Sequence, residues 1–288
     1  MTVYVAIDDP HSYLLLQCLA PFQARFGVAY DFRTVLNKQD KMFPAPKLWD
    51  QNGFQDGVWL AKLYGLRFPA EPPDYTAAQN HQFTAQLLQW ESQPEYLPKA
   101  LSLFASYWHG NDVELDRLAS TAVAHQSETY QQQLATNEAR LKENGHYLSG
   151  MLHYGGEWYW GLNRLQYLER RLLDLRLQTD NDSGVKFDLG QRNFLNQAAQ
   201  GSADGREKTP LVVYWSVRSP YSYLGLVRGR QLAEHYGVPF IIKPVLPMLM
   251  RDMPVPRTKA LYIAQDTKRE AKQHGLPFGR IADPLGLG

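Results

Sequence analysis

The sequence predicts a protein of the α/β class with two copies of one unit in tandem, the first carrying an all-helical insert and the second incomplete. Residues 3–68 align with residues 213–278 without a gap, and 20 of the 66 aligned positions are identical. Composition alone would give about four identities over that length. Each copy also begins with a short apolar run that leads into a helix, the pattern of a strand–helix–strand unit. Together these observations predict a repeated α/β domain.

The first copy begins as strand, helix and strand. Val3–Ile7 is a short apolar run of strand type. Asp9 and Pro10 follow as an N-cap and a first helical residue, and the helix is expected to end at Gly27. A second strand is predicted over Val28–Leu36, parallel to the first because a helix connects the two.

The rest of the first copy is expected to be mostly helical and to close with a hairpin. A helix precedes Gly65, and residues 74–143 are predicted to be an all-helical insert. The large apolar residues of this insert are interpreted as core; they are Phe83, Leu87, Leu88, Leu101, Phe104, Tyr107 and Trp108. Two strands flank residues 155–157, which is a hairpin signal, and a closing helix is predicted over Asn163–Leu177.

The domain boundaries follow from these patterns. Residues 1–177 form a complete first domain, and the polar residues 178–209 are interpreted as a linker with a short helix near Phe194–Ala199. Residues 210–288 form the second copy, which corresponds only to the first half of the first. We therefore expect the native protein to continue beyond Gly288, or this chain to be a truncated or cleaved form.

Composition and charge argue against several classes of protein. The chain is 44% hydrophobic and 20% charged, which is typical of a globular protein. Its formal net charge of +1 gives no reason to expect nucleic acid or a membrane surface as partner. No apolar run approaches the roughly 20 residues that span a bilayer, and no signal segment precedes the first strand. A cytoplasmic location is expected.

The metal-ligating residue types are sparse. Cys18 is the single cysteine, which excludes an internal disulfide and a thiolate cluster. Its leucine neighbours suggest a buried, structural thiol. The eight histidines show no close pairing at the spacing of metal ligands, so no metal site is predicted.

Both copies carry a short motif where the first strand meets the first helix. The two motifs are Asp9-Pro10-His11-Ser12 and Ser219-Pro220-Tyr221-Ser222. They resemble the active-site corner of DsbA-like thioredoxin folds, in which the motif is Cys-Pro-His-Cys. Both cysteines are replaced in both copies. Because disulfide exchange requires thiolates, the sequence argues against redox chemistry at either corner.

The second copy resembles a narrower family. Residues 211–286 are similar to 2-hydroxychromene-2-carboxylate isomerases, which are related to kappa-class glutathione transferases. The segments that carry this resemblance are Ser219–Gly225, Pro244–Pro247, Pro254–Lys259 and Gly275–Gly279. The first copy resembles the same family more faintly, most clearly over Gly156–Gly161 and the following Asn163-Arg164-Leu165.

The resemblance implies a glutathione-dependent isomerase or transferase that acts on an aromatic or enone substrate. Ser219 would stabilise the glutathione thiolate at a helix N-terminus, where backbone N–H groups favour an anion. Lys259 would pair with the thiolate or with a substrate carboxylate. The other residues that the resemblance places at a glutathione or substrate site are Pro220, Tyr221, Ser222, Arg257 and Tyr262.

The same resemblance suggests that the first copy has a degenerate site, whose residues are Asp9, His11, Ser12 and Gly150. The carboxylate of Asp9 would repel a thiolate. Gly150 stands where thioredoxin folds place a cis-proline, and a trans peptide is expected there. Leu162-Asn163 stands where the family usually has a polar residue and an aspartate that hold the glutathione amino group.

Simpler interpretations stay open for most of these residues. Ser219 and Asp9 are both good N-caps, and Lys259 could be a solvated helix charge. His11 and Tyr221 follow proline on what is expected to be an exposed corner, where either could touch a ligand. Two alternative functions also remain: a non-catalytic binding or scaffold protein whose first domain mediates partner contact or homodimer formation, and, less favoured, a thiol–disulfide oxidoreductase.

Overall fold

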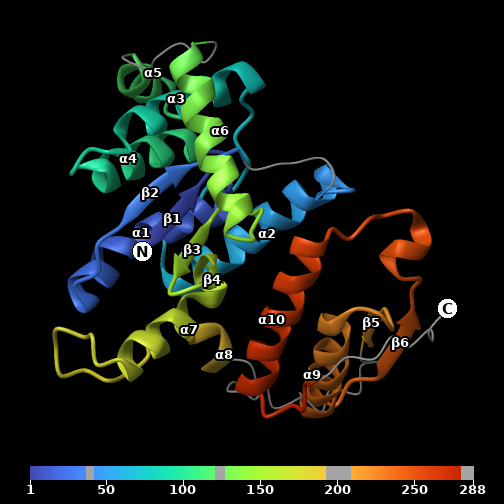
Figure 1. The fold of residues 1–288 in the computed structure, drawn as a ribbon. Helices are drawn as coiled ribbons and strands as arrows, with labels where there is room; N and C mark the ends of the chain where they lie inside the picture. The colour runs from blue at the N-terminus through green and yellow to red at the C-terminus, as the bar shows by residue number, and fades with distance from the viewer. Residues whose placement is uncertain (37–41, 121–126, 193–208, 280–288) are drawn as a thin grey trace. The chain divides into compact units, whose positions relative to one another are not determined.

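The computed structural model describes residues 1–36, 42–120, 127–192 and 209–279. The chain divides into two compact units, Met1–Gly190 and Gln191–Gly288 (Figure 1). No helix among the described residues is both long and apolar enough to cross a lipid bilayer.

The first unit is built on a four-stranded mixed sheet. The strands in spatial order are β2 (Asp31–Thr34), β1 (Thr2–Val5), β3 (Met151–Tyr154) and β4 (Glu157–Trp160). β1 runs parallel to β2 and antiparallel to β3, and β3 and β4 form the predicted hairpin. Helix α1 (Pro10–Phe26) joins β1 to β2, and α7 (Gly161–Asp174) follows β4. This mixed α/β arrangement is compatible with a DsbA-like thioredoxin fold.

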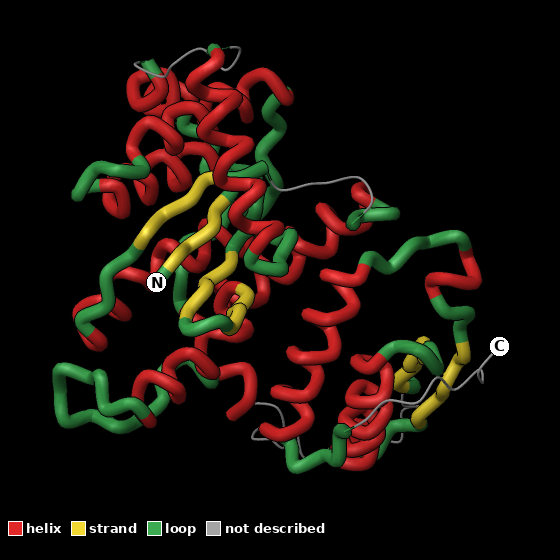
Figure 2. The backbone as a smooth tube through the Cα atoms, viewed as in Figure 1, coloured by secondary structure: helices red, strands yellow, loops and turns green. Residues whose placement is uncertain are grey.

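An all-helical segment is inserted between β2 and β3, as the sequence predicts. Its helices are α2 (Pro46–Tyr64), α3 (Ala77–Trp90), α4 (Tyr96–Trp108), α5 (Asp112–Ala119) and α6 (Glu128–Glu143). Helices α3, α4 and α5 gather near one end of the sheet (Figures 1 and 2). The apolar stripe of the insert is buried as expected, apart from the half-buried Leu101. Strands β1 and β2 are shorter than the apolar runs that predicted them.

The first unit extends past the boundary that the sequence suggests. The guanidinium of Arg25 donates hydrogen bonds to the carbonyls of Asp182 and Gly184, at 2.8 and 2.7 Å. The same group forms a buried ion pair with Glu169 of α7. The ring of Phe187 packs 5.9 Å from that of Phe22. Residues 178–190 are therefore held against the first unit, although their polar composition suggested a linker.

A short helix, α8 (Leu189–Arg192), contains the boundary between the two units in the sequence. The helix predicted near Phe194–Ala199 lies outside the described residues.

The second unit repeats the first elements of the first in order. Parallel strands β5 (Leu211–Trp215) and β6 (Phe240–Pro244) are joined by α9 (Pro220–Tyr236), and a 3₁₀ turn, η1 (Met248–Arg251), leads to α10 (Arg257–Gln273). Helix α9 begins and ends 210 residues after α1. A duplication in the history of this chain stays a prediction.

Candidate functional site

The first strand–helix corner is centred on the buried carboxylate of Asp9. Its Oδ1 accepts a hydrogen bond from the His11 backbone N–H, and its Oδ2 accepts one from Ser12 N–H, both at 3.1 Å. Pro10 occupies the first turn, where its missing N–H costs nothing. The Ser12 hydroxyl donates to Asp9 Oδ2 at 2.6 Å and accepts from the backbone N–H of Ala6. Asp9 thus caps α1 as its sequence context predicts.

Two residues that precede β3 close this corner from the other side. The hydroxyl of Ser149 donates to Asp9 Oδ2 at 2.9 Å. Gly150 has a trans peptide and a φ of +63°, and a Cβ on it would lie 2.8 Å from Asp9 Oδ2. The four residues of the suspected degenerate site, Asp9, His11, Ser12 and Gly150, therefore lie together. Ser149 was missed, because nothing local marks it as a partner of Asp9.

His11 is buried, with 4% of its surface exposed, so the expectation of an exposed corner is wrong there. Its ring packs 4.6 Å from that of Trp160, and the backbone of Gly161 approaches it closely. The junction of β4 and α7 covers the N-terminus of α1, and this long-range packing has no signal in the local sequence.

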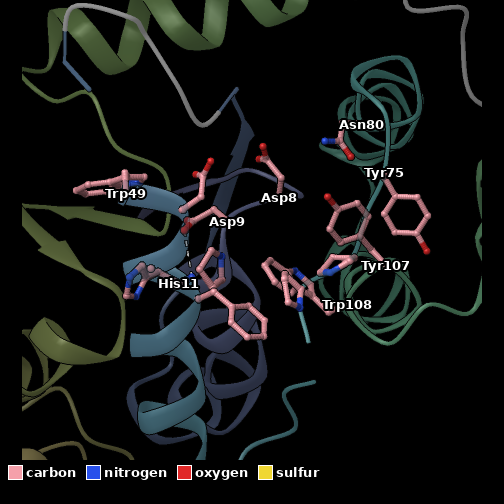
Figure 3. A pocket seen from close by; sticks show the side chains of 14 residues that line it. Asp8, Asp9, His11, Trp49, Tyr75, Asn80, Tyr107 and Trp108 are labelled. Carbon is pink, nitrogen blue, oxygen red and sulfur yellow. Dashed lines mark hydrogen bonds between the residues drawn. The ribbon is translucent and has the colours of Figure 1, made fainter. Parts of the chain in front are cut away.

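A cavity of about 210 Å³ opens at this first corner (Figure 3). Three carboxylates line it, those of Asp8, Asp9 and Asp50. Its aromatic lining residues are Trp49, Phe54, Tyr75, Tyr107 and Trp108. Among the lining residues within the described ranges, none is lysine or arginine. We call this site the Asp8 cavity.

The sequence held one usable signal for the Asp8 cavity. Trp49 occupies the place of Lys259 when the two copies are aligned at a shift of 210 residues. Because Lys259 was predicted to be a site residue, the aligned residue of the first copy, Trp49, could have been predicted as one too. Tyr107 and Trp108 were assigned to the core; they are buried there and line the cavity as well.

Several polar groups of the Asp8 cavity are held in their neutral or paired forms. Burial, reinforced by the charge of Asp8, raises the pKa of Tyr107. Burial raises the pKa of Tyr75 to about 12, and its hydroxyl donates to Asp112 at 2.9 Å. Both phenols therefore stay protonated at neutral pH and can donate hydrogen bonds.

The second corner has the same backbone with a different side chain. Ser219 caps α9, and its Oγ accepts a hydrogen bond from Ser222 N–H at 3.3 Å. Ser222 Oγ in turn accepts from the backbone N–H of Ser216 at 3.2 Å. Tyr221 is 36% exposed, as expected, and its hydroxyl donates to Asp266 of α10 at 2.6 Å.

Helix α10 presents one face to this second corner. Lys259, Tyr262 and Asp266 are spaced three and four residues apart, so they share a face of the helix. Asp266 on that face is the partner of Tyr221. Burial lowers the pKa of Lys259. Tyr262 is buried, whereas Arg257 at the start of the helix is exposed.

The single thiol is not at either corner. Cys18 is buried in the core of the first unit, and burial raises its pKa to about 12. Within the described residues, no group of three or more histidine, cysteine, aspartate or glutamate side chains is arranged to hold a metal ion.

Comparison with known proteins finds a likeness in structure but none in sequence. No protein-family model matches the chain, and no curated protein matches it. A solved structure of 2-hydroxychromene-2-carboxylate isomerase in selenomethionine form is similar to it at a TM-score of 0.47 and 16% sequence identity. The match covers 61% of this chain and 95% of that one.

Proposed function

We propose that the chain is a glutathione-dependent isomerase or transferase of the 2-hydroxychromene-2-carboxylate isomerase and kappa type, with its reactive site at the second corner. The observation that carries this proposal is the neutral hydroxyl of Ser219 at the N-terminus of α9. Backbone N–H groups and the helix dipole favour an anion at that place, and a hydroxyl can donate to a thiolate. The carboxylate that caps α1 could not.

The residues around Ser219 support an anionic ligand. Arg218 precedes it, where the first copy has Asp8, and Lys259 stands where the first copy has Trp49. Lys259 also lies on the face of α10 that meets the corner. A glutathione thiolate, and a carboxylate on the substrate, would both be favoured by these positive charges.

The proposed reaction has no net change in composition or oxidation state. The thiolate adds to the β-carbon of an α,β-unsaturated ketone, and the carbon–carbon double bond becomes a single bond that can rotate. Elimination then expels the thiolate and restores the double bond in the other geometry. Ser219 stabilises the thiolate before addition and after elimination, so it lowers the pKa of the glutathione thiol.

The test is a glutathione titration followed by the ultraviolet absorbance of the thiolate, with Ser219→Ala and Ser219→Asp beside the unchanged chain. Aspartate caps a helix as well as serine does, but it repels a thiolate. We expect the thiolate signal to be lost in both variants. A signal that survives in Ser219→Asp would reduce Ser219 to a helix cap and overturn the proposal.

A second candidate function, a non-catalytic binding protein, is favoured by one observation. Strand β6 and the loop after it expose the apolar side chains of Ile241, Ile242 and Leu246, and Tyr214 of β5 is exposed as well. Because Ile241 and Ile242 are consecutive in β6, apolar side chains are exposed on both faces of this strand. Exposed apolar surface is typical of a protein–protein contact. This alternative predicts an oligomer by light scattering and no glutathione binding.

The third alternative, a thiol–disulfide oxidoreductase, is the least favoured. Its nucleophile would have to be Cys18, which is buried and has a raised pKa, so it is not a thiolate at neutral pH. Reduction of insulin by the purified protein would revive this alternative.

A further inference from the structure

Strand β5 has an open edge that its counterpart in the first unit does not have. At the shift of 210 residues, Leu211–Trp215 aligns with Met1–Val5, which contains β1. Strand β1 pairs with β2 on one side and with β3 on the other, whereas β5 pairs within the described residues with β6 alone. The edge that β1 uses to bind an antiparallel strand, β3, is therefore the edge that β5 leaves open.

Two residues of β5 present their backbone polar groups at this open edge. The N–H of Leu211 and the carbonyl of Trp215 make 2.8 Å hydrogen bonds to the residues that flank β6, so both groups face β6. The backbone polar groups of successive residues point to opposite sides of a strand. Those of Val212 and Tyr214 therefore face away from β6 and are available to another strand.

The side chain of Tyr214 shows how much surface is left uncovered beside this edge. The aligned residue, Tyr4, has 0% of its surface exposed and packs against Trp158 of β4, with 5.6 Å between the ring centroids. In the first unit, the strands beyond the edge thus help to bury the tyrosine. Tyr214 is 65% exposed, although it is the same residue type at the same place in its strand.

The open edge of β5 is suited to a second copy of itself. None of its five residues is charged, so two such edges can meet without repulsion between like charges. Edge strands are commonly protected by charges or by proline. The outer edge of β6 has this protection, because Pro244 lies where its missing N–H would face away from β5. The edge of β5 is not protected in this way.

We propose that two copies of this chain associate through the open edges of their β5 strands, which pair antiparallel about a two-fold axis at Val213. Val212 of each copy then lies opposite Tyr214 of the other, and the two residues exchange backbone hydrogen bonds. An aromatic residue opposite a β-branched one is a favourable cross-strand pair. The two strand pairs become one four-stranded sheet in the order β6-β5-β5-β6. This inference does not depend on the function proposed for Ser219.

The test is analytical ultracentrifugation of the full chain at concentrations from about 1 to about 200 µM. We expect the mass to rise with concentration from the 33.0 kDa of one chain towards twice that value. A single strand edge gives a small interface, so a dissociation constant in the micromolar range is expected.

Val212→Pro separates edge pairing from folding. The N–H of this residue faces away from β6, so proline is compatible with the β5–β6 pair but removes hydrogen bonds between the two copies. We expect the dissociation constant to rise at least about tenfold. The matched control is Ile242→Pro in β6, where the N–H faces away from β5, and the dimer is expected to be unchanged. Circular dichroism checks that both variants fold.

Val213→Cys tests the register of the two strands and does not rely on proline. On the two-fold axis the two residues form a non-hydrogen-bonded pair, whose Cα atoms are about 4.5 Å apart, within the range of a disulfide. Oxidation with diamide is expected to link the two chains through a bond that dithiothreitol cleaves. Ile242→Cys, which is not at the axis, is expected to link poorly. The native Cys18 is buried and serves as the background in both variants.

Three outcomes would overturn the proposal. One is a monomer over the whole concentration range, which is expected if the edge of β5 binds a strand from a different protein. Another is an unchanged dissociation constant in a folded Val212→Pro variant. The third is equal cross-linking of Val213→Cys and Ile242→Cys.

Discussion

The two strand–helix corners share a backbone and differ in almost everything that surrounds it. Asp9 and Ser219 have φ and ψ angles of −98° and 115°, and −94° and 116°. Three residues later, Ser12 and Ser222 each use their hydroxyl oxygen to accept a backbone N–H from the preceding strand end, at 3.1 and 3.2 Å. The first corner is nevertheless a buried carboxylate network beside an acidic cavity. The second is a partly buried hydroxyl that follows Arg218 and lies at the face of α10 carrying Lys259 and Asp266.

The difference shows that local sequence determines the backbone of each corner, whereas tertiary packing determines its chemistry. The cap, the proline after it and the glycine at the helix C-terminus are local signals, and they produce the same turn in both places. The chemistry depends on what packs against that turn. At the first corner it is Ser149 and Gly150, which come from about 140 residues away in the sequence.

The largest effect on stability is expected from Arg25→Ala, because the Arg25 side chain links α1 to α7 through an ion pair and to residues 182–184 through hydrogen bonds. Removing Arg25 leaves the buried Glu169 carboxyl without its cation, with only the backbone N–H groups of Lys186 and Phe187 as donors, so we expect the first unit to lose about 3–5 kcal/mol. Tryptophan fluorescence during urea unfolding measures this loss, since Trp215 is the one tryptophan of 7 outside the first unit.

The matched control is Arg230→Ala in α9, where the ion pair with Glu234 is 74% and 63% exposed. Its expected cost is at most about 0.5 kcal/mol. Equal effects of the two substitutions would contradict the contrast between a buried and an exposed pair.

A smaller effect is expected from Gly150→Ala, which tests the closure of the first corner. Alanine at a φ of +63° is strained by about 1–2 kcal/mol. Its Cβ would also lie 2.8 Å from Asp9 Oδ2 and 3.0 Å from His11 Cβ, which adds about 1–3 kcal/mol of overpacking. Chemical denaturation of the purified variant gives the sum.

Gly156→Ala separates the two contributions. Its φ is +78°, and a Cβ there would meet no atom within 4 Å among the described residues. Only the backbone strain of about 1–2 kcal/mol is then expected. If Gly150→Ala lowers the free energy of unfolding no more than Gly156→Ala does, the close approach of residue 150 to Asp9 does not contribute to stability.

Ser219→Ala is expected to destabilise α9 by about 1 kcal/mol through loss of the cap, and Ser219→Asp by much less. Hydrogen exchange over Pro220–Tyr236 measures this directly. Faster exchange in both variants would mean that the serine does more at this corner than cap the helix.

The smallest expected effect concerns pH. Burial, with help from Arg140 and the N-terminal ammonium, lowers the pKa of His153 in the folded state. As the pH falls, His153 is therefore protonated in the unfolded chain, near the ordinary histidine pKa of about 6.5, before it is protonated in the folded chain. The stabilisation by neutral His153 is present above that pH and is lost as the pH falls through the folded pKa.

His153→Gln should accordingly flatten the decline in stability of the first unit between about pH 7 and pH 5. Because the site is partly solvated, the difference is expected to be about 0.5 kcal/mol or less. Unfolding curves at several pH values provide the measurement, with the exposed His235→Gln as control. A steeper loss of stability with falling pH in His153→Gln would contradict the expectation that protonation of His153 destabilises the first unit.

Much of the local structure could be predicted from the sequence. Short apolar runs indicated the strands, and the glycines at residues 155 and 156 indicated the hairpin. The spacing of apolar residues indicated the helical insert, because a buried face repeats every three or four residues in a helix. The caps and helix ends at Asp9, Gly27 and Ser219 were also predicted, since a cap depends only on residues a few positions away. The charge difference between Asp9 and Ser219 was visible as well.

Only the tertiary structure decided the environment of those residues. Nothing near His11 shows that Trp160 will cover it, and nothing near residues 182–184 shows that Arg25 will bind their carbonyls. The Asp8 cavity likewise combines residues from α1, α2, α3 and α4. Sequence patterns report the burial of a face but not the identity of its partner, because packing joins segments that are far apart in the chain. The backbone of each corner was therefore determined locally, and its chemistry by long-range contacts.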